Sequence, residues 1–199
     1  MCEIYTIGHS THSAEKFIEL LSMHSITAIG DVRSSPYSKF NPQFNRETIQ
    51  KELKRHGISY VFLGKELGPR SDDPACYQDS KVQYSRLAKT DLFLEGIERL
   101  KNGMKTFRIA LMCSEKDPVT CHRMILICRN IRSEQTDIKH ILEDGTLENN
   151  CDSEKRLMQI LKIPQAELFD SEEDLIQRAY DKQSKKIAHV ITHDAHDDV

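Results

Sequence analysis

The segment from Cys113 to Arg123 holds the residue types with the most chemical potential in the chain. Cys113 and Glu115 follow an apolar run, and Cys121, His122 and Arg123 then open a segment of helical period. The free N–H groups and positive dipole of a helix start favour an anion, and such surroundings lower the pKa of a thiol and raise its reactivity. We therefore predict that one of the two cysteines is a nucleophile, that Glu115 and His122 move protons, and that Arg123 binds an anionic ligand.

Other arrangements of the same residues compete with this interpretation. A cysteine phosphatase loop would need an arginine six positions after the cysteine, but Val119 stands there. Cys113, Cys121 and His122 could instead supply three ligands for zinc, with His9 as a fourth. Because the segment lacks a C-x-x-C pair, we predict no metal and no cofactor, with zinc as the weaker alternative. In the third arrangement the cysteines are small buried residues, and the acid and the arginine form a structural ion pair.

Polar side chains also follow the first two predicted strands. His9 could act as an acid, a base or a ligand because histidine titrates near neutral pH, and the adjacent Ser10 could contact a ligand or cap the turn. Asp31 could be a carboxylate base and Arg33 a planar fork for an anion, or the two could form an ion pair that fixes the next loop. We predict that all four residues, together with Arg123, bind the ligand.

Short apolar, β-branched runs alternate with helical periodicity, which indicates βα units around a mostly parallel sheet. We expect an open, Rossmann-like α/β sheet flanked by helices, with a helical C-terminal extension. The expected strands cover 3–8, 26–32, 58–63, 107–112 and 138–142, and the expected helices cover 13–24, 46–56, 90–102, 119–132, 153–162 and 171–187. We number these strands one to five. If their order is 3-2-1-4-5, strands one and four are neighbours, and His9 and Ser10 lie near Cys113 and Cys121 at the carboxyl edge.

Composition limits the class of protein. The chain has 199 residues, 28 basic and 31 acidic residues, and a formal charge of −3, so its whole surface is not a nucleic-acid footprint. Its longest apolar runs are far shorter than the ~18 residues of a membrane-spanning helix. We expect a cytoplasmic protein with no membrane partner, in which the six cysteines are not a disulfide framework. The expected organisation is an α/β domain over 1–150, a helical extension packed on it over 151–190 and a flexible tail over 191–199; the oligomeric state is left open.

Two polar loops provide the basis for a non-catalytic alternative. The loop over 33–46 interleaves Tyr37, Phe40 and Phe44 with basic and amide side chains that could stack on and bind a nucleic-acid base. Together with the segment from Lys65 to Arg70, it could form a basic face for nucleic acid or a protein. The more ordinary arrangement is a solvated loop with its aromatic side chains folded onto the core.

The motifs together resemble the bacterial and archaeal domain-of-unknown-function family 488. The resemblance rests on segments 4–10 (IYTIGHS), 31–36 (DVRSSP), 41–45 (NPQFN), 60–68 (YVFLGKELG) and 110–123 (ALMCSEKDPVTCHR), and it continues through 140–142 and 168–188. It implies an α/β fold and marks these motifs without naming a substrate. The chain departs from the expected pattern after Gly68, where a glycine- or arginine-rich stretch is replaced by Pro69-Arg70-Ser71-Asp72-Asp73.

These observations favour an enzyme, a hydrolase or a transferase, that acts on an anionic small molecule of nucleotide-like or phosphorylated type. The alternatives are a non-catalytic module for nucleic acid or protein, and a metal-binding variant of the same site.

Overall fold

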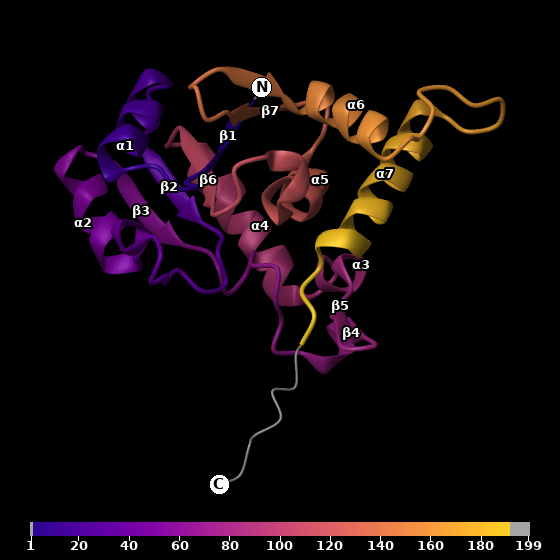
Figure 1. The fold of residues 1–199 in the computed structure, drawn as a ribbon, viewed down its shortest axis with the longest axis horizontal. Helices are drawn as coiled ribbons and strands as arrows, with labels where there is room; N and C mark the ends of the chain where they lie inside the picture. The colour runs from indigo at the N-terminus through magenta and orange to yellow at the C-terminus, as the bar shows by residue number, and fades with distance from the viewer. Residues whose placement is uncertain (1, 192–199) are drawn as a thin grey trace, which may run out of the picture.

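The computed structural model describes residues 2–191, which form an open α/β fold around a six-stranded sheet in the order β3-β2-β6-β1-β7-β8 (Figure 1). Every neighbouring pair of strands in this sheet is parallel except β7 and β8. Its strands are β1 (Cys2–Gly8), β2 (Ala28–Asp31), β3 (Ser59–Phe62), β6 (Ile109–Cys113), β7 (Thr136–Ile141) and β8 (Leu147–Asn149). The predicted fold class is confirmed.

The two central strands, β6 and β1, are covered on both faces. All five residues of β6 are buried, as is β1 from Ile4 to Gly8. Alternate side chains of β1 enter different parts of the core, because Tyr5 and Ile7 belong to one apolar cluster and Ile4 belongs to the other. This burial explains why both strands read as nearly continuous apolar runs.

Two helices, α1 (Ala14–Met23) and α2 (Arg46–Arg55), cover one face of the sheet. Their apolar residues, including Phe17 and Leu53, share a cluster with Tyr5. The predicted N-cap of α1 is confirmed, since the Ser13 side chain accepts a hydrogen bond from the backbone N–H of Lys16.

The opposite face carries the remaining long helices and the segment after β6. These elements are α4 (Asp91–Met104), η3 (Pro118–Thr120), the π-helix η4 (Arg123–Cys128), α5 (Arg129–Ile131), α6 (Asn150–Ile160) and α7 (Glu172–Ile187). The C-terminal helices join the same core, because Leu157 of α6 and Leu175 of α7 lie in one cluster with Leu100 of α4.

The chain beyond α7 returns to the long polar loop that follows β3. This loop contains η2 (Pro74–Cys76), the hairpin of β4 (Tyr77–Gln78) and β5 (Lys81–Val82), and α3 (Tyr84–Leu87), while η1 (Pro42–Phe44) lies in the earlier loop. The backbone N–H of Val82 donates to His189 at 3.0 Å, and that of Ile191 donates to Ser80 at 2.8 Å. The end of the described chain is therefore tied to the hairpin, as the path below α7 in Figure 1 shows.

The structure differs from the elements considered in the sequence. The order 3-2-1-4-5 would place 3–8 between 26–32 and 107–112, but β6 lies between β2 and β1. The connection from β1 to β2 passes over β6, and the connection from β6 to β7 passes over β1. The expected helix over 119–132 is divided into η3, η4 and α5, and the short antiparallel strand β8 was not expected. The predicted tail lies outside the described residues from 192 onward.

Within residues 2–191, no helix is both long and apolar enough to cross a membrane.

Candidate functional site

The carboxyl ends of β1 and β6 hold the predicted site together. Gly8 is paired with Cys113 in the sheet, and the backbone N–H of His9 extends the ladder to the Cys113 carbonyl at 2.9 Å. A Cβ atom on Gly8 would lie 1.9 Å from the Glu115 carbonyl oxygen, so only glycine permits this close approach of the loop. The GHS motif therefore positions the loop after β6 through its backbone.

Four predicted catalytic side chains converge in this loop. Cys113, Glu115, Cys121 and His122 each present one potential ligand atom, and these four atoms lie within 4.8 Å of one another. Both thiols donate to the same carboxylate oxygen of Glu115, at 2.8 Å from Cys113 and 3.0 Å from Cys121. The cysteines and the histidine are buried, whereas Glu115 is exposed.

A backbone contact at Nε2 orients the His122 ring so that Nδ1 faces the two sulfur atoms. Its Nε2 lies 3.0 Å from the Val32 carbonyl oxygen, which can only accept, so Nε2 carries the proton. Nδ1 faces the two sulfur atoms, 3.5 Å from Cys113 Sγ and 3.8 Å from Cys121 Sγ. A histidine held by a backbone carbonyl in this way is typical of metal ligands.

The electrostatic environment keeps the cysteine with the deeper burial protonated. Cys121 is 1% exposed, and loss of solvation on burial raises the pKa of its thiol well above the usual value. Desolvation also acts to raise the pKa of Glu115, but the hydrogen bonds donated by Cys113 and Cys121 outweigh it, so the pKa of this carboxyl is lowered. Two thiol donors thus share one carboxylate acceptor.

Arg123 is fully buried and engaged by the protein. Its guanidinium donates to Thr6 Oγ1 at 3.2 Å, to the Glu115 carbonyl at 2.5 Å and to the Lys116 carbonyl at 3.0 Å. The backbone N–H of Arg123, at the start of η4, donates to Cys121 Sγ at 3.4 Å. Arg123 thus holds the loop against β1, and the helix start is occupied by a sulfur atom of the cluster.

Asp31 and Arg33 form a buried, bidentate ion pair. Arg33 Nε and Nη2 donate to the two carboxylate oxygens at 2.9 and 2.7 Å, and Nη2 also donates to the Phe44 carbonyl at 2.9 Å. Tyr60 donates its hydroxyl to Asp31 Oδ2 at 2.7 Å. The structure therefore shows the ion-pair arrangement, while a ligand-binding role for either residue stays a prediction.

His9 belongs to this ion pair and not to the cysteine cluster. Arg33 Nη1 donates to its Nε2 at 3.2 Å, so Nδ1 carries the proton and donates to the Ser10 carbonyl at 2.9 Å. Burial, followed by the charge of Arg33, lowers the pKa of His9 to about 4, and its ring stacks on Phe44 with centroids 4.2 Å apart. Ser10 has a left-handed backbone conformation with φ of 47°. Its backbone N–H donates a hydrogen bond to the Ser114 carbonyl.

The sequence analysis missed a buried series of hydrogen-bonded polar side chains that begins at Arg123. Thr6 Oγ1 accepts from Arg123 and lies 2.8 Å from His140 Nδ1, and His140 Nε2 lies 3.2 Å from Asn150 Oδ1. The Asn150 amide then donates to Glu154 at 2.7 Å. Burial and the nearby arginine lower the pKa of His140 to about 3, so it is neutral and fits this direction of hydrogen bonding. The available signal was a polar residue inside each of two apolar strands.

A second missed residue is Tyr84 of α3. Its side chain is buried, and desolvation, followed by electrostatic interaction with Cys121, Cys113 and Glu115, raises its pKa. Tyr84 belongs to the same buried apolar cluster as Cys113 and Cys121, although it comes from the long polar loop, where no motif marked it.

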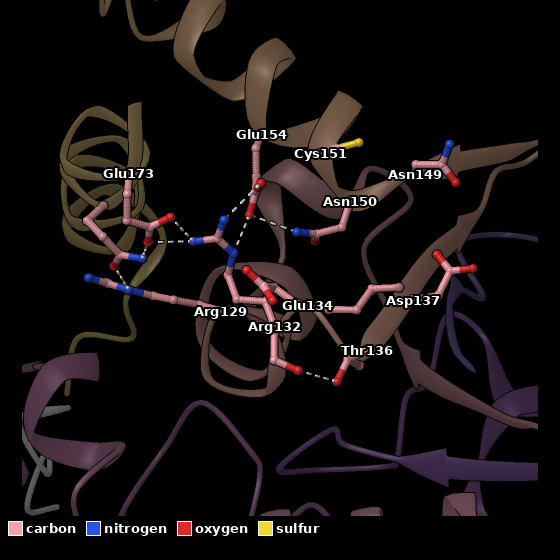
Figure 2. Close-up of a pocket in the computed structure, with 13 residues that line it drawn as sticks. Arg129, Arg132, Glu134, Thr136, Asp137, Asn149, Asn150, Cys151, Glu154 and Glu173 are labelled. Atoms are coloured by element: carbon pink, nitrogen blue, oxygen red, sulfur yellow. Dashed lines mark hydrogen bonds and ion pairs between the residues drawn. The ribbon is translucent and has the colours of Figure 1, made fainter. Parts of the chain in front are cut away.

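This series of hydrogen-bonded side chains ends at a cavity of about 820 Å³ between β7, α6 and α7, which is drawn in Figure 2. Figure 2 shows Arg132 between two carboxylates, and it pairs with Glu154 at 3.0 Å and with Glu173 at 2.6 Å. Arg129 is likewise paired with Asp181 at 2.7 Å. The charges of both arginines in this cavity are thus already compensated by the protein.

Comparison with known proteins supports the family resemblance. No curated protein and no solved structure matches the chain. The model of the family described as "Domain of unknown function DUF488" matches residues 13–129, which is more than half of the chain and includes the whole segment from Cys113 to Arg123. The chain therefore belongs to the DUF488 family.

Proposed function

We propose that this chain is a cytoplasmic, metal-dependent enzyme of the hydrolase or transferase class, with a zinc-type ion bound by Cys113, Cys121 and His122. The observation that carries the proposal is the position of His122 Nδ1, 3.5 Å from one cysteine sulfur and 3.8 Å from the other. Sulfur and nitrogen ligands of one tetrahedral zinc, at ~2.3 and ~2.0 Å from the metal, lie about 3.5 Å apart. The two sulfur-to-nitrogen distances thus suit the ligands of one zinc ion.

The surroundings of the three residues also suit a bound cation. The Val32 carbonyl orients His122, the Arg123 backbone N–H contacts Cys121 Sγ, and the Arg123 guanidinium fixes the loop. Partners of this kind orient ligands and tune the metal. His9, the fourth ligand considered from the sequence, lies outside the cluster, where the fourth polar side chain is that of Glu115.

The choice of a metal centre over a thiol nucleophile rests on the contacts of the two thiols. Cys113 and Cys121 are 3% and 1% exposed, and each already donates to Glu115. An anionic substrate would be attracted to the metal ion, since the guanidinium groups of Arg33 and Arg123 have protein partners. Binding of nucleic acid or a protein by the loop over 33–46 stays the alternative.

Metal analysis of the purified protein tests the proposal. We expect about one equivalent of zinc in the wild type and in Cys128→Ala, which changes a buried cysteine outside the cluster. Cys121→Ser and His122→Ala should lose it. If the wild type, reconstituted with zinc after removal of bound metal, retains less than about 0.1 equivalent, the metal centre is excluded, and selective alkylation of Cys113 would then support the thiol nucleophile.

A further inference from the structure

The cluster contains three buried residues and one exposed residue, and this difference distinguishes Glu115 from the other three. Cys113, Cys121 and His122 are at most 5% exposed, whereas Glu115 lies between exposed Ser114 and Lys116. The side of the cluster nearest to solvent is therefore the side of Glu115. Structural zinc sites are closed by four protein ligands, whereas catalytic sites keep one position for solvent or substrate.

The distances separate the same three residues from Glu115. The sulfur-to-nitrogen separations match two ligands of one tetrahedral ion, but Glu115 Oε2 lies only 2.8 and 3.0 Å from the sulfurs. An oxygen and a sulfur bound to one tetrahedral zinc would be about 3.5 Å apart. The carboxylate is thus placed for hydrogen bonds with the thiols and not for coordination beside them.

We propose that Cys113, Cys121 and His122 are the complete set of protein ligands, and that the fourth coordination position opens on the solvent side, next to Glu115, to water or a small anion. This inference rests on the proposed metal centre. When the ion binds, each thiol releases its proton to solvent and forms a metal–sulfur bond, and both S–H···O contacts end. Glu115 is then free to turn outward, where its carboxylate lies beside whatever occupies the fourth position.

This role makes Glu115 a positioning residue with a clear signature. Removal of a permanent ligand causes a large loss of affinity, whereas removal of a residue outside the coordination sphere costs about 10- to 100-fold in metal affinity. The open position also predicts that a small anion changes the spectrum of the bound ion. A closed site with four protein ligands predicts neither result.

Cobalt substitution of the full chain separates these cases. We expect the wild type to bind one equivalent of Co²⁺ with sulfur-to-cobalt charge-transfer absorption, and we expect azide to shift its visible d–d bands. Glu115→Gln should retain this absorption, with a dissociation constant raised by no more than about 10- to 100-fold. Cys121→Ser should weaken the sulfur-to-cobalt absorption and raise the dissociation constant further. Glu143→Gln, an exposed carboxylate paired with Lys116, is the matched control and should behave as wild type.

Two outcomes oppose the inference in different ways. If Co²⁺ binds with sulfur charge transfer, but azide leaves the spectrum unchanged or Glu115→Gln lowers the affinity as strongly as Cys121→Ser does, then the fourth ligand is Glu115, and only the inference of an open position fails. If the wild type shows no sulfur-to-cobalt charge transfer, the metal centre itself fails.

Discussion

Replacement of Arg123 by lysine tests whether this arginine fixes the loop or serves a ligand. In the folded protein its guanidinium satisfies three acceptors, which are Thr6 Oγ1 and the carbonyls of Glu115 and Lys116. A lysine ammonium cannot reach all three from one position, and each buried acceptor left without a donor costs roughly 1–3 kcal/mol. With one or two acceptors unsatisfied, we expect Arg123→Lys to lower the free energy of unfolding by about 3 kcal/mol.

Urea denaturation followed by circular dichroism measures this loss, and the midpoint of thermal unfolding should fall by roughly 6–12 °C. Arg86→Lys is the matched control, because Arg86 also donates to two backbone carbonyls, those of Ala75 and Tyr77, but on the surface. Its effect should stay within about 0.5 kcal/mol. Equal stability of Arg123→Lys and Arg86→Lys would refute the structural role and favour Arg123 as a free anion-binding group.

Three further predictions follow from the same contacts. Gly8→Ala places a methyl group 1.9 Å from the Glu115 carbonyl oxygen and should lower the free energy of unfolding, measured with urea, by about 1–3 kcal/mol. The control Gly103→Ala meets one side-chain tip at 3.0 Å and should lower it little. Equal effects of the two variants would contradict the close approach of the loop to Gly8. His140 has a folded pKa of about 3, below the value of about 6.5 in an unfolded chain, so its contribution to stability is full above pH 6.5 and is lost as pH falls toward 3, with a slope of up to about 1.4 kcal/mol per pH unit. His140→Gln should flatten the stability–pH curve over that range, and an unchanged slope would show that His140 is not buried in its neutral form. Iodoacetamide should label exposed Cys2 and Cys151 of the native protein before buried Cys113 and Cys121, as measured by peptide mass spectrometry. The reverse order would support the hypothesis of an activated thiol nucleophile.

The sequence allowed the sheet to be predicted because its strands are short, apolar and regularly spaced. β6 and β1 read as buried strands because both of their faces are covered. Their adjacency was predicted correctly, although the full order was not, since the crossing of connections over a neighbouring strand leaves no local pattern in the residues. The π-helix η4 is a continuous apolar run after Arg123, and such a run over six residues does not distinguish a π-helix from an α-helix.

The site was only partly predictable for a similar reason. Cys113, Glu115, Cys121 and His122 lie in one loop, so spacing alone brought them together. The partners that decide what each group can do come from distant parts of the chain. Arg123 meets Thr6 across 117 positions, and His122 meets the Val32 carbonyl across 90. Both contacts depend on the fold, which is why the sequence left Arg123 and the cysteines with several roles.

Anomalous diffraction at the zinc absorption edge, from crystals of the zinc-loaded protein, tests the central claim most directly. We predict one anomalous peak about 2.3 Å from Cys113 Sγ and Cys121 Sγ and about 2.0 Å from His122 Nδ1. Density for water or an anion should occupy the fourth position on the side of Glu115. No anomalous peak beside well-ordered cysteines in the zinc-loaded crystals would contradict the metal centre.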